Sequence, residues 1–319
     1  MKVYGCKSYS NIIEMIDLDN ALVLSDHLGG FDMNLHNDVL YSLNNWCLEQ
    51  DTKLNIDCQQ IMEDSVLHQY NRLTIRFGMA LQYNIIMKHF EMYTVHPRIE
   101  FDNFLCSFNG SAHVSRQLLS SIINKFGYFN PVYCSKNFAY SNGFISEQLR
   151  HLDLTTNEIQ LYSKFFIDNS EFNDTIYSFG HVRYDHARNI YNLEDKLTKS
   201  FVHIVSETMA TSYCPSVSEK FLYSIVTRGL FVAYAQPNWH AHIEQYYGFK
   251  LYDTIFDYRF DKIKNPVKRL VALMEMISKF SHLSIDDWND LYLMEQDNIE
   301  YNYDHYFSKR YLDVLKQHE

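Results

Sequence analysis

The tripeptide Ser218-Glu219-Lys220 places a hydroxyl, a carboxylate and an ammonium group together at the start of a helical pattern. Ser218 suits the N-cap of that helix, because its side chain can accept a hydrogen bond from a free backbone amide. The apolar positions that would face the core are Phe221, Leu222, Ile225 and Val226. A helix N-terminus of this kind favours the binding of an anion such as a phosphate.

The segments on either side of this helix predict a strand–helix–strand unit. The apolar run Phe201–Val205 predicts a buried strand that ends at Ser206-Glu207-Thr208, and Leu230–Ala235 predicts a second strand after the helix stop at Arg228-Gly229. A parallel pair joined in this way puts the helix N-terminus at the carboxyl edge of the sheet, where α/β proteins bind ligands. We therefore expect this unit to hold the diphosphate and the ribose of a sugar nucleotide.

An earlier strand and helix repeat this arrangement. Phe101–Phe108 predicts a strand that ends at Asn109, and Val114–Phe126 predicts a helix with His113 and Arg116 at its first turn. The inward positions of this helix are Leu118, Leu119, Ile122 and Ile123. An arginine near a helix N-terminus opposes the helix dipole unless it serves an anion. Arg116 is therefore a candidate phosphate contact, and a surface arginine is the alternative interpretation.

The order of these features resembles a known enzyme family. A strand ending in Glu207-Thr208, the Ser218-Glu219-Lys220 helix start, Gly229 before an apolar strand, Gly248-Phe249 and then Phe256–Asp261 follow one another. This order resembles the donor-binding region of the α1,3-fucosyltransferase-like glycosyltransferases of GT-B type, and even more their diverged viral and bacterial relatives. The resemblance covers roughly residues 99 to 270. Thr227-Arg228 and Leu230-Phe231 depart from the family pattern, as does Gly110-Ser111-Ala112, which replaces an often Arg-rich stretch.

The resemblance implies a GT-B-like α/β fold with two Rossmann-like domains, a donor cleft between them and C-terminal helices. The domains would be residues 1–97 on the acceptor side, 98–283 for the nucleotide sugar, and helices in 284–319 that could pack back on the first domain. The implied reaction moves a sugar from a GDP- or UDP-sugar to a hydroxyl of a glycan or another acceptor. It needs no bound metal and no further cofactor.

The resemblance also implies roles for individual side chains. The implied donor-binding residues are Asn109, His113, Arg116, Glu207, Ser218, Glu219 and Lys220. Lys220 and Arg116 would contact the diphosphate, and Glu219 would bind the ribose. Glu207 would reach the sugar or order its loop.

An acidic loop near the start of the chain is a candidate for the acceptor side. The predicted strand Ala21–Leu24 runs into Ser25–Asp32, which contains a glycine pair. The glycine spacing is too irregular for a dinucleotide fingerprint, and a plain glycine turn with exposed acids is the alternative. If the transfer inverts configuration, a base in the first domain must deprotonate the acceptor hydroxyl. The candidates for that base are Asp26, His27 and Asp32.

Composition narrows the class of protein. The 319 residues carry a formal net charge of −11, which argues against nucleic acid or an anionic membrane as the main partner. The six cysteines form no C-x-x-C pair, and the sequence shows neither a signal peptide nor a long apolar segment. These features predict a soluble, cytoplasmic protein with reduced thiols. Asp17-Leu18-Asp19 precedes a predicted strand rather than following one, so we do not expect it to bind a metal.

Two alternative functions stay open on the sequence. One is a nucleotide- or glycan-binding protein of the same fold without turnover, which the missing Arg-rich stretch favours slightly. The other is a metal-dependent hydrolase, although H-x-x-x-x-H and H-x-H spacings alone predict little. The residues that such a hydrolase would use are His181, Asp185, His186, His240 and His242.

The remaining pattern predicts the elements that hold these residues in place. Further strands are expected at Lys2–Cys6 and Leu73–Phe77, and a domain junction near Pro97. Further helices are expected at Asn37–Glu49, Gln59–Asn71, Leu81–Tyr93, Asn265–Phe280, Asp286–Met294 and Tyr306–Gln317. The H-x-H pair His240/His242 should enter another helix, which ends at Tyr247-Gly248 and on which the two side chains would diverge.

Overall fold

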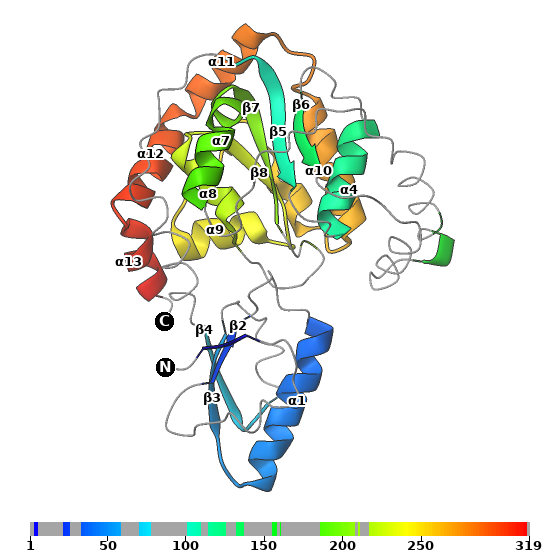
Figure 1. The fold of residues 1–319 in the computed structure, drawn as a ribbon, viewed down its shortest axis with the longest axis vertical. Coiled ribbons are helices and arrows are strands. Elements are labelled where there is room, and N and C mark those ends of the chain that lie inside the picture. Colours follow the sequence, from blue (N-terminus) through cyan, green and yellow to red (C-terminus); the bar gives the residue numbers. More distant parts are fainter. Residues whose placement is uncertain are drawn as a thin grey trace.

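The fold is of the mixed α/β class and contains two four-stranded parallel sheets (Figure 1). The computed structural model describes residues 3–5, 22–25, 33–58, 70–77, 101–109, 114–125, 132–136, 155–157, 160, 186–207, 210 and 217–317. The predicted helix Leu81–Tyr93 and the expected junction at Pro97 lie outside these residues. No helix in the described ranges combines the length and the hydropathy that a membrane crossing requires.

The first sheet has the strand order β1-β2-β3-β4 with all neighbours parallel. Its strands are β1 (Val3–Gly5), β2 (Leu22–Ser25), β3 (Leu54–Cys58) and β4 (Leu73–Phe77). The strands predicted at the positions of β1, β2 and β4 are confirmed, whereas β3 lies outside the predicted strands. Its sequence alternates apolar and polar residues, and Leu54 and Ile56 are buried.

Helix α1 (Met33–Glu49) contacts the first sheet through β4. It begins four residues before the predicted Asn37. Its side chains Leu40, Leu43 and Cys47 are buried, whereas Leu48 is 45% exposed. The helix predicted for Gln59–Asn71 does not reach its expected end, because Asn71 lies in a turn before β4; residues 59–69 are outside the described part.

The second sheet has the strand order β6-β5-β7-β8, again with all neighbours parallel. Its strands are β5 (Asn103–Asn109), β6 (Val132–Lys136), β7 (Ser200–Ser206) and β8 (Leu230–Tyr234). The chain passes from β5 to β6 on one side and later returns to β7 on the other side of β5. The strand order therefore reverses between β5 and β7, which is the switch point where α/β sheets bind ligands.

Helices cover both faces of the second sheet (Figure 1). Helices α4 (Val114–Lys125) and α10 (Pro266–Ser278) contact each other on one face. Helices α7 (His186–Thr198) and α8 (Glu219–Val226) contact each other on the opposite face. The predicted inward positions of α4 and α8 are all buried, so these two patterns are confirmed.

Besides α10, the chain after β8 forms five elements that pack in the region of α8, α9 and α10. Its elements are α9 (Trp239–Tyr247), a 3-10 helix η4 (Tyr258–Lys262), α11 (Ile285–Met294), α12 (Gln296–Phe307) and α13 (Arg310–Lys316). Helix α12 packs on α8, and α13 packs on α9. The sequence left a contact of the C-terminal helices with the first domain open. Their described contacts include α8, α9 and, through Trp288 of α11, the rings of Phe104 in β5 and Phe201 in β7.

The predicted helix Tyr306–Gln317 is two helices rather than one. Lys309 has a left-handed backbone with φ of 61°, which separates α12 from α13.

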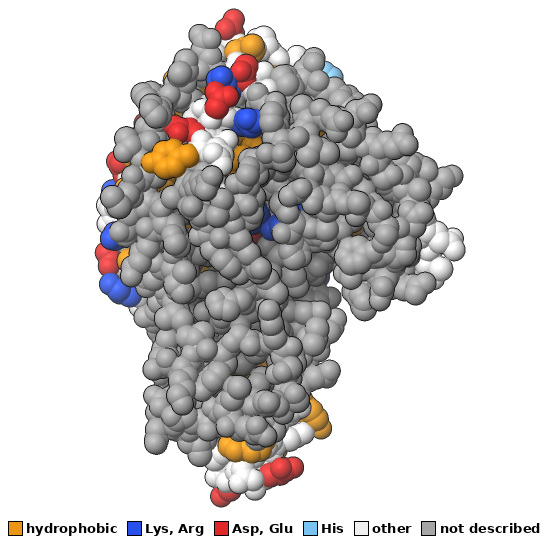
Figure 2. Space-filling view, in the orientation of Figure 1, with side chains coloured by type: hydrophobic (Ala, Val, Ile, Leu, Met, Phe, Trp, Pro, Cys, Tyr) orange, Lys and Arg blue, Asp and Glu red, His pale blue; other side chains and the backbone are white. Residues whose placement is uncertain are grey.

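Over the C-terminal helices, Figure 2 shows Lys and Arg side chains interspersed with Asp and Glu side chains. The described surface there has mixed charge, which suits water rather than a strongly charged partner.

Aromatic packing fixes the start of α8. The Phe221 ring meets the rings of Phe231, Trp239 and Phe249 edge to face, at centroid distances of 4.9, 5.5 and 5.1 Å. Each of these rings belongs to a different segment, so a single side chain locks α8 to β8, α9 and the chain beyond it. The polar residues just before Phe221 are thereby held at the carboxyl edge of the sheet.

Candidate functional site

The switch point sets two polar side chains side by side at the carboxyl edge of the second sheet. Strands β5 and β7 pair through Cys106 and His203, and the same register three residues further sets Asn109 beside Ser206. On the other side, Ser206 pairs with Tyr234 of β8. Asn109 is buried, and its side-chain amide donates to Ser107 Oγ at 3.2 Å.

Side chains of the same strand–helix–strand unit cap the N-terminus of α8. Ser218 is the N-cap, as predicted, and its Oγ accepts from the Lys220 backbone amide at 3.4 Å. Glu207 follows β7 directly, and its Oε1 accepts from the Ser218 backbone amide at 2.9 Å. Of the two roles expected for Glu207, this contact corresponds to ordering the loop.

Lys220 and Glu219 form an ion pair with each other. The Lys220 Nζ lies 2.9 Å from Glu219 Oε1 and 3.4 Å from Ser218 Oγ. The two charged side chains are only 14% and 25% exposed. An anion that binds Lys220 must therefore share the ammonium group with Glu219 or displace that carboxylate.

Arg116 contributes a second cation from α4, on the other face of the sheet. It lies in the first turn of α4 and is buried, and burial lowers the pKa of its guanidinium while Glu219 and Glu207 oppose the shift. The carboxylates of the α8 unit are therefore close enough to act on a charge from α4. Two cations and two carboxylates thus lie near enough to influence one another's charge, where the N-termini of α4 and α8 flank the switch point.

Burial shifts the other pKa values in this cluster too. The pKa of Glu207 is raised by burial, against the opposing effects of Lys220 and of the Ser218 hydrogen bonds. The pKa of Lys220 is lowered by burial and then by Arg116, while Glu219 and Glu207 oppose the shift. Perturbation of several neighbouring groups at one sheet edge is typical of functional sites, although structural ion-pair clusters show it as well.

No family model, curated protein or solved structure matches this chain.

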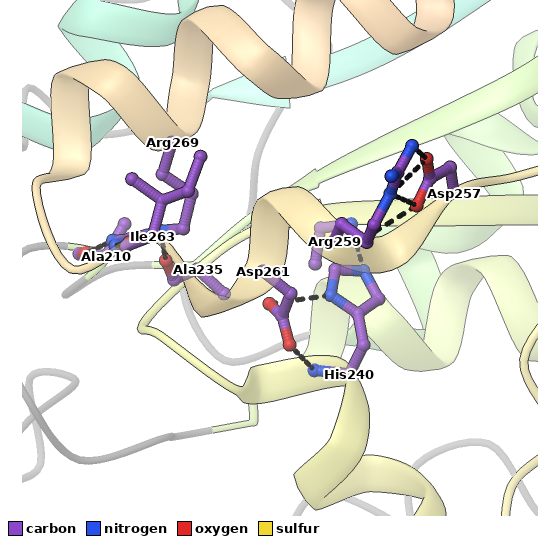
Figure 3. A network of polar contacts seen from close by, with 9 residues as sticks. Ala210, Ala235, His240, Asp257, Arg259, Asp261, Ile263 and Arg269 are labelled. Carbon is purple, nitrogen blue, oxygen red and sulfur yellow. Dashed lines mark hydrogen bonds and ion pairs between the residues drawn. The ribbon is translucent and has the colours of Figure 1, made fainter.

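The two histidines of the H-x-H pair in α9 have separate surroundings, and Figure 3 shows His240 beside Asp261. His240 Nδ1 lies 2.9 Å from Asp261 Oδ1, and His240 Nε2 accepts from the Ala233 backbone amide at 3.0 Å. The proton therefore sits on Nδ1, and neither ring nitrogen is left for a ligand. His242 lies instead beside Tyr246 and Tyr247, and burial lowers its pKa to about 3.

Of the other hydrolase candidates, His181 and Asp185 lie outside the described residues, and His186 is the first residue of α7. Within the described ranges, no three His, Cys, Asp or Glu side chains gather as metal ligands would. The geometry of His240 and His242 thus gives the hydrolase alternative no support.

A buried arginine braces the same edge from α10. Arg269 is 1% exposed, and its guanidinium donates hydrogen bonds to four backbone carbonyls. The carbonyls belong to Ala210, Ala235, Ile263 and Lys264. Figure 3 shows this clamp, which ties the loop after β7 to the end of β8 and to the start of α10. Burial lowers the pKa of Arg269.

The structure brings most of the expected donor-binding residues together. Those at this edge are Asn109, Arg116, Glu207, Ser218, Glu219 and Lys220. His113 and the three candidate bases Asp26, His27 and Asp32 lie outside the described residues.

Two polar residues at this edge, Ser206 and Arg269, were not among the predicted site residues. The position of Ser206 at the end of an apolar strand was a signal, whereas Arg269 gave none, because an arginine in an amphipathic helix is normally exposed.

Proposed function

We propose that this chain is a glycosyltransferase that moves a sugar from a GDP- or UDP-sugar to a hydroxyl acceptor without a bound metal. The observation that carries the proposal is the cluster of Arg116, Lys220, Glu207 and Glu219 at the switch point. Ligands of open α/β sheets bind at such a point, and both cations lie at helix N-termini that favour an anion.

The residue types match what this reaction requires. A nucleoside-diphosphate leaving group needs positive charge, and most of the catalysis comes from positioning and charge stabilisation. Arg116 and Lys220 would supply that charge. Carboxylates accept hydrogen bonds only, so Glu219 and Glu207 suit the hydroxyls of a ribose or a sugar. The base that deprotonates the acceptor would come from Asp26, His27 or Asp32 in the first domain.

Two parallel sheets in one chain support the GT-B-like arrangement that this proposal includes. In Figure 1 the carboxyl ends of β5 to β8 point to the side on which the sheet β1 to β4 lies. A donor held at that edge would then meet an acceptor held by the first domain. The alternative, nucleotide binding without turnover, differs only in the lack of transfer, and turnover assays with a panel of sugar nucleotides separate the two.

The first test measures nucleotide binding without metal. GDP or UDP in the presence of EDTA is expected to raise the melting temperature, because a ligand that binds only the folded state stabilises it by RT ln(1 + [L]/Kd). The gain is about 2.7 kcal/mol at a ligand concentration about a hundred times Kd. A scan without any shift for GDP, UDP, CMP and dTDP at millimolar concentration would contradict the proposal.

The second test separates the roles of Lys220 and Glu219. Lys220→Ala is expected to weaken binding of the nucleoside diphosphate by about ten- to a hundredfold and to leave the nucleoside unaffected, because a hydrogen bond to a charged group contributes about 1.5–3 kcal/mol. Glu219→Ala is expected to weaken the nucleoside and to tighten inorganic pyrophosphate, because it frees the ammonium group of Lys220. Calorimetry with all three ligands measures both effects.

Lys316→Ala is the matched control for this comparison. Lys316 pairs with Asp313 on the exposed surface of α13, so its removal should change no ligand affinity. If Lys220→Ala and Glu219→Ala bind every ligand as the parent does, the start of α8 has a structural role only.

A further inference from the structure

Ser206 carries a buried hydroxyl that no contact within the described part of the chain explains. It is the last residue of β7 and is 1% exposed. Its Oγ has no hydrogen-bond partner among the residues that the structure describes. A buried hydroxyl without a partner is destabilising, and such groups in native proteins usually have a reason to persist. A ligand that binds there would be such a reason.

The face to which Ser206 belongs follows from its strand partners. Ser206 pairs with Tyr234, so the two side chains lie on the same face of the sheet. The Tyr234 hydroxyl donates to the carbonyl of Pro266, the first residue of α10. Ser206 therefore faces the layer of α4 and α10, with Asn109 of β5 beside it.

This side of the sheet edge has a positive electrostatic character. Both α4 and α10 begin at the carboxyl edge, and the first turn of neither helix contains an acidic residue. Their early turns carry the buried guanidinium groups of Arg116 and Arg269. The start of α8 is less positive than the starts of α4 and α10, because the carboxylate of Glu207 accepts a hydrogen bond from the backbone amide of the N-cap Ser218. An incoming anion is thus favoured on the α4 side of the switch point.

We propose that Ser206 is a further binding residue, whose hydroxyl donates a hydrogen bond to an oxygen of the phosphate that lies at the first turns of α4 and α10, while the other phosphate of the same diphosphate reaches Lys220. The proposal rests on the proposed function, since the diphosphate would be that of the sugar donor. It assigns the two helix starts different parts of one ligand. One phosphate lies toward α4 with Arg116 and Ser206, the other reaches Lys220 at the start of α8, and the hydroxyl-bearing part lies toward Glu207 and Glu219.

The test compares Ser206→Ala with Ser200→Ala in the full-length protein. Ser200 lies at the opposite end of the same strand and is also buried, but its Oγ donates to the Lys196 carbonyl at 2.7 Å. Calorimetry measures the affinity for inorganic pyrophosphate and for GDP, and thermal unfolding without ligand measures the Tm. Ser206→Ala is expected to weaken both ligands by about ten- to a hundredfold.

The Tm distinguishes a binding hydroxyl from a structural one. Ser206→Ala breaks no hydrogen bond within the described residues, so its Tm should equal or exceed that of the parent, whereas Ser200→Ala should lower the Tm and keep the parent affinities. A lower Tm for Ser206→Ala, or an unchanged affinity for pyrophosphate, would overturn the inference.

The same data separate this inference from the proposed function. If pyrophosphate binds in a Ser206-dependent manner but no sugar nucleotide is turned over, the subsite stands and the transferase proposal fails. If GDP binds to the parent and to Ser206→Ala with equal affinity, the nucleotide site stands and the role of Ser206 is overturned. If the parent binds neither pyrophosphate nor GDP, both are overturned.

Discussion

Gly229→Ala is expected to lower the free energy of unfolding by about 3 kcal/mol or more, which lies at the upper end of the cost of overpacking a core. A Cβ added at Gly229 would lie 2.1 Å from Cε1 and 2.4 Å from Nδ1 of the His203 ring. Real Cβ atoms essentially never come closer than 3.0 Å to a non-bonded heavy atom of another residue. The ring cannot easily retreat, because it is buried and its Nε2 lies 2.7 Å from the Leu197 carbonyl.

Urea unfolding of Gly229→Ala, His203→Ala and the double variant measures this contact. The double variant should recover part of the loss, because removing the ring makes room for the new methyl group, and the cycle then gives a favourable coupling between the two positions. Gly229→Ala with parental stability would show that the His203 ring does not lie on the turn between α8 and β8.

Arg269→Met is expected to destabilise the protein by about 3 kcal/mol or more, because each buried carbonyl that loses its partner costs about 1–3 kcal/mol. Arg269→Lys should lie between this variant and the parent, since an ammonium group keeps the charge but cannot span carbonyls from separate segments. Chemical denaturation measures the stability. Amide exchange of the loop after β7, which the guanidinium holds through Ala210, should accelerate in both variants.

Arg259→Met provides the matched control, because Arg259 lies in the same region as Arg269 (Figure 3) but is exposed, whereas Arg269 is buried. Arg259 is 88% exposed and pairs only with Asp257 two residues away among the described residues. Its replacement should leave stability and loop exchange as in the parent. Equal effects of Arg259→Met and Arg269→Met would refute the clamp.

The sequence predicts the strand–helix–strand unit well because its signals are local. Strand β8 is an unbroken apolar run, β7 is apolar except for Ser200, His203 and Ser206, and α8 has a cap residue at its start and a glycine shortly after its end. Helix α12 lacks such a signal, since its buried positions include Asn302 and His305. These side chains bind backbone groups of Lys250 and Tyr247. Because they alternate with the buried Ile299 and Tyr306, the inward face of α12 lacks a continuous hydrophobic period.

The candidate site is predictable only in its residue types. Sequence reasoning can place Glu207 at a strand end and Lys220 at a helix start, because both follow from local patterns. It cannot show that Glu207 turns back to the Ser218 amide or that Lys220 is paired with Glu219. Such contacts depend on how the loop folds over the sheet edge. Arg269 is missed for the same reason, since its carbonyl partners come from distant parts of the chain.

The contacts of α12 determine the order in which this half of the protein can be completed during synthesis. Arg228 binds Glu300 and Lys250 binds Asn302 across 72 and 52 residues of chain. Strands β5 to β8 therefore leave the ribosome well before the helix that covers α8. Until α12 has been made, α8 lacks the helix that packs against it, and partly exposed helices of this kind are where nascent chains meet chaperones or aggregate. The residues of the candidate site all precede α12 in the chain, yet the site reaches its final packing only after α12 has been made.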